Sequence, residues 1–198
     1  MNFKYPSFWM SASNKRKRIY SILAVFVLAI LVVIVGFIIP PSPLFVQEIN
    51  DQTNQIVYQD PTARGISIFT NNFPLCLAMF VPLVGLPIGL FLMFNTGQGF
   101  RALLEVQLAN GTSTTTPSPS QFSGTTAVLA LIFAVLTFVF EFVSYSVAMS
   151  ESIWLFRRIT QGKGRHELKN LLIMIGVIAI LLALGGVVET LALYLVGI

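Results

Sequence analysis

The sequence predicts an all-α protein, a polytopic membrane helix bundle with about five transmembrane segments. The first observation is composition: 55% of the 198 residues are hydrophobic, 10% are charged, and the mean hydropathy is +0.80. A soluble domain carries about 25% charged residues, so this chain cannot cover a water-facing surface. The second observation is a series of apolar runs that approach or exceed the roughly 20 helical residues needed to cross a hydrocarbon core of about 30 Å.

The third observation is the placement of the basic residues, which predicts orientation. Ten of the twelve form two groups beside apolar runs: Lys4, Lys15, Arg16, Lys17, Arg18, and then Arg157, Arg158, Lys163, Arg165, Lys169. Such groups mark the cytoplasmic side and favour anionic lipids, which argues against nucleic acid as a partner. We expect a multi-pass protein of the cell membrane, with a cytoplasmic N-terminus at residues 1–18 and one transmembrane domain at 19–198.

The N-terminal half divides into a regular span and an irregular one. Residues 19–39 form an uncharged run that prolines end, and a polar segment near 40–65 is expected to be an external loop. The next apolar run, 66–94, contains three prolines within it, which predicts a broken second segment. Such a break is tolerated in a membrane where protein or cavity water satisfies the freed backbone groups.

Residues 95–99 contain an asparagine and two glycines, which predict a turn before a short third segment over 97–109. That segment is short for a span, so it either crosses with tilt or thinning, or is re-entrant, which leaves four crossings. A Ser/Thr/Pro-rich stretch near 110–124 follows and is expected to be external, with Asn110 as a glycosylation candidate. Residues 127–156, a basic cytoplasmic loop at 157–169, and residues 171–196 complete the chain.

Two sets of small or polar residues are candidate sites. Pro82, Gly85 and Gly89 have helical spacing and predict a face that another helix approaches closely, with a functional hinge as the alternative. The second set is a stripe on the fourth segment within about 120° of arc, consisting of Glu141, Ser144, Tyr145, Ala148, Glu151 and Ser152.

The two carboxylates of this stripe are the strongest functional signal. A charge at the bilayer centre costs roughly 2.5–3.5 kcal/mol on insertion scales, so Glu141 is expected to face protein or water, or to carry a proton. The amides of Asn72 and Asn95 are its expected hydrogen-bond partners. Glu151 is expected to reach towards Arg157 or Arg158.

Two motifs resemble the stage II sporulation protein M-like integral membrane family. They are "FTNNFPLCLAMFVPLVGLPIGLFLMFNTGQGF" at residues 69–100 and "FEFVSYSVAMSESIWL" at 140–155, and the similarity spans about half the chain. By position, the matched family residues are Asn72, Asn95, Gly99 and Glu141, whereas Thr137 and Phe138 stand where the family has His-Gly. The resemblance implies a membrane scaffold for enzymes that remodel peptidoglycan.

The residues contain no pattern typical of an enzyme, a cofactor site or a metal site. The single cysteine, Cys76, lies in an apolar run, and the single histidine, His166, lies in a basic segment. We therefore expect a non-catalytic scaffold or subunit of a larger membrane complex, whose partners are the lipid bilayer and other subunits or further copies of the chain. The alternative is a small transporter or permease component that uses the broken second segment and Glu141.

Overall fold

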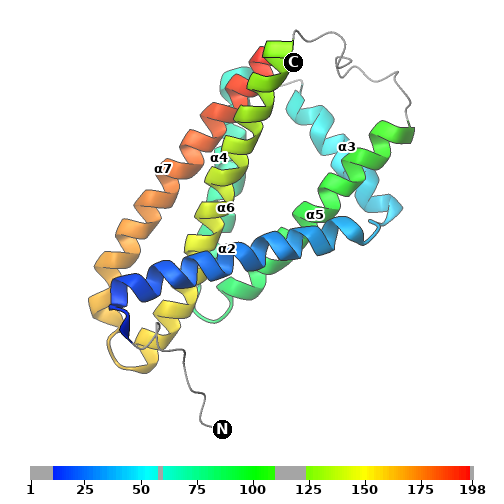
Figure 1. The fold of residues 1–198 in the computed structure, drawn as a ribbon. Helices are drawn as coiled ribbons and strands as arrows, with labels where there is room; N and C mark the ends of the chain where they lie inside the picture. The colour runs from blue at the N-terminus through cyan, green and yellow to red at the C-terminus, as the bar shows by residue number, and fades with distance from the viewer. Residues whose placement is uncertain (1–10, 58–59, 110–123, 197–198) are drawn as a thin grey trace.

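The computed structural model describes residues 11–57, 60–109 and 124–196, and these residues are helical apart from short connections. The helices are α2 (Asn14–Ile38), α3 (Pro43–Val57), α4 (Pro61–Ala78), α5 (Gly85–Ala109), α6 (Gly124–Thr160) and α7 (Gly164–Val196). Helices α6 and α7 run antiparallel and side by side, α4 packs against them, and α2 crosses both α6 and α5 (Figure 1). The predicted all-α class is therefore confirmed.

Three of the described helices are long and apolar enough to cross a membrane, and they lie at Asn14–Ile38, Leu131–Thr160 and Glu167–Ala192. Their outward faces are apolar as well, since Leu31 is 53% exposed and Ile180 is 63% exposed. A surface of this kind is stable against lipid rather than water. The number of five spans is not supported, because α4 and α5, although long enough, do not meet the same hydropathy requirement.

The predicted break in the second segment is present, but it is a reversal of the chain. Helix α4 ends at Ala78, and α5 begins at Gly85 and runs back along the molecule (Figure 1). Leu83 in the connection adopts a φ of 70°, a left-handed conformation that a leucine rarely takes. Pro82 lies in this connection and not on a helix face, so its expected place beside Gly85 and Gly89 is wrong.

The predicted turn at residues 95–99 is wrong, because α5 is continuous from Gly85 to Ala109. The separate short segment over 97–109 is the second half of this helix. Gly97 serves packing instead: a Cβ built there would lie 2.1 Å from the Val33 carbonyl oxygen of α2. On the other helix, a Cβ at Gly36 would lie 2.2 Å from the Phe94 carbonyl oxygen, so the two glycines let α2 and α5 cross in backbone contact.

Two expected loops are largely helical. The polar segment near 40–65 forms α3 and the start of α4, because Ser42 and Asp60 each stand before a proline at the first helical position. Their side chains accept hydrogen bonds from the N–H groups of Phe45 and Ala63 at 3.3 and 3.4 Å. The basic loop expected at 157–169 shortens to residues 161–163, since α6 and α7 extend into it from both sides.

The core lies where α2, α4, α5 and α7 meet the C-terminal half of α6. Its largest fully buried side chains include Met79, Met93, Phe142, Met149, Ile178 and Leu182. From residue 144 to residue 152 every side chain of α6 is buried. This stretch of α6 is therefore the axis around which the other helices are placed.

Candidate functional site: a polar cleft beside Glu141

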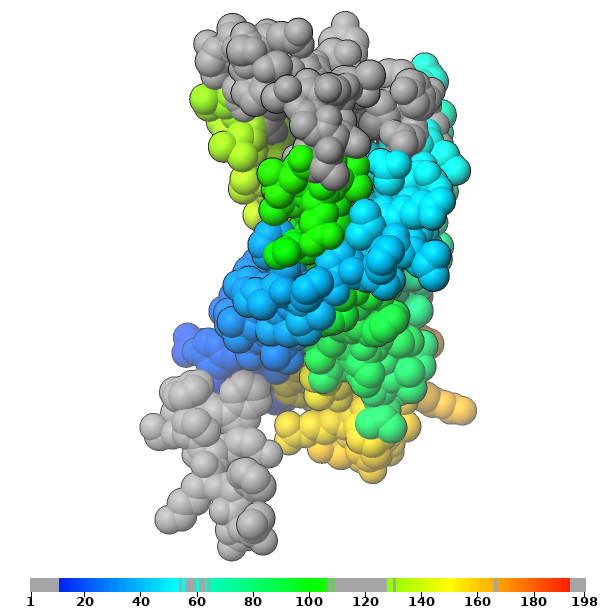
Figure 2. Space-filling model, turned by 90° about the vertical axis from the view of Figure 1, so that its right-hand side faces the viewer, coloured from blue at the N-terminus to red at the C-terminus, as the bar shows by residue number. Residues whose placement is uncertain are grey.

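A cleft of about 600 Å³ lies between α3, α4, α5 and α6. Figure 2 shows the face on which α3 lies along α5. The polar side chains that line the cleft are Glu48, Gln52, Thr53, Asn72, Asn95, Thr96 and Tyr145. Two predicted site residues, Asn72 and Asn95, are thus brought to one cavity from different helices, together with Tyr145 of the predicted stripe.

Helix α3 contributes one face of its amphipathic sequence to the cleft. Phe45, Glu48, Ile49 and Gln52 follow the i, i+3, i+4, i+7 spacing that puts side chains on one side of a helix. The Gln52 amide donates a hydrogen bond to Glu48 Oε1 at 3.3 Å, which orients the carboxylate along the helix. These residues were not predicted, although the Ser42-Pro43 helix start was a signal that could have identified α3.

The second half of α5 forms the opposite wall. Leu92, Asn95, Thr96, Gly99 and Leu103 recur every three or four residues and share the face that lines the cleft. The Thr96 hydroxyl donates to the Leu92 carbonyl at 2.9 Å, so it is occupied within the helix. Asn95 makes no hydrogen bond to Glu141 within the described part of the chain, and its amide is left for the cleft.

Glu141 is joined to the cleft through Asn72. The Asn72 Nδ2 group donates a hydrogen bond to Glu141 Oε1 at 2.7 Å, which confirms the contact expected between these two residues. Helix α7 covers the carboxylate from another side, because a Cβ built at Gly185 would lie 3.9 Å from Glu141 Cγ. The partly buried Glu141 therefore connects α6 to α4 and lies against α7, which is a packing arrangement of a membrane acid.

Gly85 and Gly89 are the close-packed residues that their spacing predicted. A Cβ at Gly85 would lie 1.8 Å from the Met79 carbonyl oxygen, and one at Gly89 would lie 2.3 Å from Met149 Sδ. Next to them, the Ser152 hydroxyl donates a hydrogen bond to the Val81 carbonyl at 2.7 Å. The same carbonyl accepts a hydrogen bond from the Gly85 N–H at 2.8 Å, so α6 adds a second hydrogen bond to the backbone of the α4–α5 reversal.

Ser144 has a structural place in the same stripe. Its hydroxyl donates to the Phe140 carbonyl at 2.7 Å, and its own carbonyl accepts a hydrogen bond from Cys76 Sγ at 3.6 Å. Both residues are fully buried. Ser146 and Ser150, on other faces of α6, are also fully buried, and their hydroxyls have no hydrogen-bond partner among the described residues. Helical periodicity did not indicate their burial, which arises because helices pack on several sides of this part of α6.

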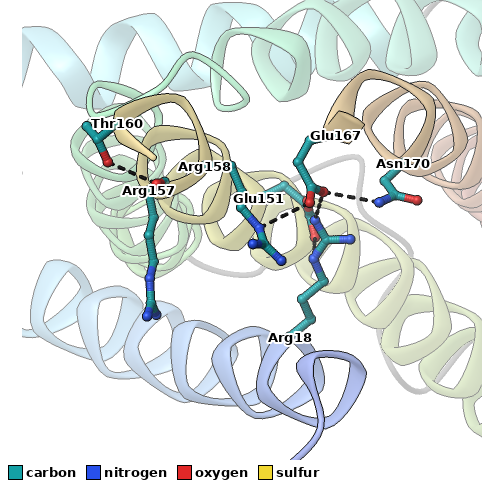
Figure 3. A network of polar contacts seen from close by, with 7 residues as sticks. All are labelled: Arg18, Glu151, Arg157, Arg158, Thr160, Glu167 and Asn170. Atoms are coloured by element: carbon teal, nitrogen blue, oxygen red, sulfur yellow. Dashed lines mark hydrogen bonds and ion pairs between the residues drawn. The ribbon is translucent and has the colours of Figure 1, made fainter. Parts of the chain in front are cut away.

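Glu151 belongs to a separate polar cluster, and its predicted partners are wrong. It pairs with Arg18 of α2, whose Nε lies 3.6 Å from Glu151 Oε1, and not with Arg157 or Arg158. Arg18 also contacts Glu167 at the start of α7, and the same carboxylate lies 3.1 Å from Arg158 Nε (Figure 3). Spacing within α6 pointed to the wrong arginines, because the true partner belongs to α2, and spacing along one helix does not indicate which residues of a distant helix lie nearby.

The chemistry of the cleft is that of binding. Its polar lining supplies a carboxylate, amides and hydroxyls with the aromatic rings of Phe45 and Phe100, and none of the described residues that line it is a lysine or arginine. This set suits a neutral polar or cationic group. Among the described residues there is no group of three or more His, Cys, Asp or Glu side chains placed to hold a metal ion. Asn110, the glycosylation candidate, lies outside the described residues.

Comparison of the chain with protein-family models, curated proteins and solved structures finds no match. The sporulation protein M-like resemblance therefore stays a prediction. The geometry of the Glu141–Asn72 contact and of the adjoining cleft is the basis for the function proposed below.

Proposed function

We propose that the chain is a non-catalytic integral membrane subunit that holds a larger membrane complex together. The observation that carries this proposal is the 2.7 Å hydrogen bond between Asn72 and Glu141. A membrane acid used for transport faces a water-filled path, whereas here an amide of α4 takes up one carboxylate oxygen and α7 packs beside the side chain. The sporulation protein M-like resemblance points to the same class of function.

The arrangement in the membrane follows from which helix ends lie together. Arg18 near the start of α2, Arg158 near the end of α6 and Glu167 near the start of α7 are joined by ion pairs, so these ends share one side. The excess of basic residues there supports the proposal that this side faces the cytoplasm. We infer three crossings by α2, α6 and α7, with α4 and α5 as a re-entrant hairpin that enters and leaves on the external side.

Cysteine labelling from outside the cell tests this topology. In a Cys76→Ala background, Ser118→Cys in the 110–124 stretch is expected to react with an impermeant maleimide, and Lys163→Cys between α6 and α7 is expected to react after permeabilisation alone. External labelling at position 163 in intact cells, or protection at position 118, would contradict the orientation.

Purification of the full chain in a mild detergent tests the scaffold function. We expect a second membrane protein or further copies of the chain to remain bound, and Glu141→Leu to release them, because the loss of the interhelical bond loosens α4 against α6. Glu141→Gln is expected to retain them, since glutamine keeps the hydrogen-bonding shape. If cross-linking in membranes before purification captures the monomer alone, with no second protein and no further copies, the proposed scaffold function is contradicted.

A second candidate function is a small transporter or permease component. It is favoured by the 600 Å³ cleft, which Asn72 and Asn95 line next to a broken membrane segment. Uptake of amines and of neutral polar solutes into proteoliposomes separates the two functions. Transport that is lost in both Glu141→Gln and Glu141→Leu would indicate a role for the charge and favour the transporter.

A further inference from the structure

A second hollow lies at the end of the molecule that carries the Arg18–Glu167 ion pair, the side proposed above to be cytoplasmic. A hollow of about 60 Å³ is lined by Asn14, Lys17, Trp154, Arg157, Arg158 and Gln161. It lies between the first turn of α2 and the last turns of α6. Its size restricts an enclosed ligand group to one the size of a small oxyanion.

The charges around this hollow do not balance. Glu151 and Glu167 are engaged by Arg18 and Arg158, which form the ion-paired cluster of Figure 3. Lys17 and Arg157 line the hollow and form no ion pair with any described residue. Within this group two carboxylates therefore face four basic side chains, so two positive charges remain available to a ligand.

Trp154 fixes the position of these cations. Its side chain is 6% exposed, and the guanidinium carbons of Arg18, Arg157 and Arg158 lie 5.5, 5.8 and 5.9 Å from its ring centre. These distances are within the range of cation–π contact. The ring holds Arg157 beside α2, towards which its side chain points (Figure 3). The buried Nε of Arg158 lies 3.1 Å from Glu167 Oε1 as an ion pair, and it makes no hydrogen bond within the described part of the chain.

We propose that this hollow binds a phosphate group, with Arg157 and Lys17 as its charged donors and Trp154 as its floor. A planar guanidinium and an ammonium are the side chains that recognise phosphate. Tryptophan and basic residues at the cytoplasmic ends of spanning helices stand at the level of lipid headgroups. Two sources carry this chemistry at that depth, an anionic phospholipid and a soluble phosphate compound.

The test uses the full chain with Trp9→Phe, which leaves Trp154 as the single tryptophan and its fluorescence as the readout. The probes are nanodiscs of phosphatidylcholine with increasing phosphatidylglycerol, and inorganic phosphate added to nanodiscs of phosphatidylcholine alone at constant ionic strength. We expect phosphatidylglycerol to change Trp154 emission saturably. Saturation by inorganic phosphate alone would support the phosphate site and assign it to a soluble compound.

A matched pair of double variants separates the site from general surface charge. Lys17→Gln with Arg157→Gln is expected to weaken the response roughly 100-fold, because each charge-assisted hydrogen bond to the phosphate that is lost reduces binding by about tenfold. Lys163→Gln with Lys169→Gln removes the same charge from residues that do not line the hollow, and is expected to leave the response nearly unchanged. Equal weakening by both pairs, or no saturable response to either probe, would overturn the proposal.

Folding of the variants is checked by size-exclusion chromatography and thermal melting. If the Lys17/Arg157 pair proves unstable, Arg157→Lys is used, since it keeps the charge and loses the planar donor pair. We expect this variant to bind phosphate more weakly than the wild type at unchanged melting temperature. Unchanged binding would contradict the assigned role of Arg157.

Discussion

The two parts of α5, from Gly85 to Met93 and from Asn95 to Ala109, have different surroundings. From Gly85 to Met93 the helix is pressed against the α4–α5 reversal and α6, and added atoms at Gly85 or Gly89 would collide with their neighbours. From Asn95 onwards one face borders the cleft, and a Cβ at Gly99 would lie 3.7 Å from Ile49 Cδ1, an ordinary contact distance. The first part of α5 is therefore closely packed against its neighbours, whereas the cleft-facing side of the second part leaves room beside it.

The largest effect is expected from Gly85→Leu. Its Cβ meets the Met79 backbone, which cannot move without displacing the reversal, so we expect a loss of about 1–3 kcal/mol in the free energy of unfolding. The measurement is thermal or denaturant unfolding in detergent. Gly176→Leu is the control, because nothing lies within 4 Å of a Cβ there. Equal stability of the two variants would show that the first half of α5 is not tightly packed.

The next effect is expected from Gly97→Ala, which sharpens the comparison within the second half. The new Cβ would lie 2.1 Å from the Val33 carbonyl oxygen, so α2 and α5 must separate, at an expected cost of about 1–2 kcal/mol. Gly99→Ala, two residues away on the cleft side, is expected to change stability by less than about 0.5 kcal/mol. The unfolding curves of both variants measure the two losses in stability. A larger loss for Gly99→Ala than for Gly97→Ala would contradict the placement of α2 against Gly97.

A smaller effect is expected from Glu141→Leu, which removes the bond to Asn72 at the border between the packed region and the cleft. An interhelical hydrogen bond in a membrane contributes about 0.6–2 kcal/mol, and Glu141→Gln is expected to lose less than Glu141→Leu. A double-mutant cycle with Asn72→Leu measures the coupling between the two side chains. Additive losses would show that the two residues do not stabilise each other.

The smallest effect is expected from Arg101→Gln, on the outer side of the second half of α5. Arg101 Nε lies 2.7 Å from Glu105 Oε1, the pair that the one-turn spacing indicates. Both side chains are more than one-third exposed, so the pair contributes less than about 0.5 kcal/mol. The unfolding midpoint is expected to stay within the error of the wild type. A loss comparable to that of Gly97→Ala would mean that this side of the helix is buried in an assembly.

Local features of the fold and site were predictable where one helix decides them. The apolar runs indicated α2, α6 and α7, and the stripe on α6 identified Glu141, Ser144 and Ser152 as inward-facing. Asn72 could be named as a partner for Glu141, because few polar groups are available to a carboxyl inside a bilayer. The Gly85–Gly89 spacing likewise indicated close packing, since small side chains on one helix face have few other uses in a membrane.

The helical class, the apolar surface and the residues that must find polar partners follow from the sequence, because leaving charges and backbone groups unsatisfied in lipid is costly. The place where the chain reverses and the charges that meet depend instead on how the helices pack. Gly97 lies in an Asn/Gly-containing stretch typical of a turn, but it is part of a helix. A glycine is needed there for packing, because α2 occupies the space that a side chain would fill. Glu151 pairs with Arg18 since α2 crosses α6 at that point, a contact between residues far apart in the chain that no local period encodes.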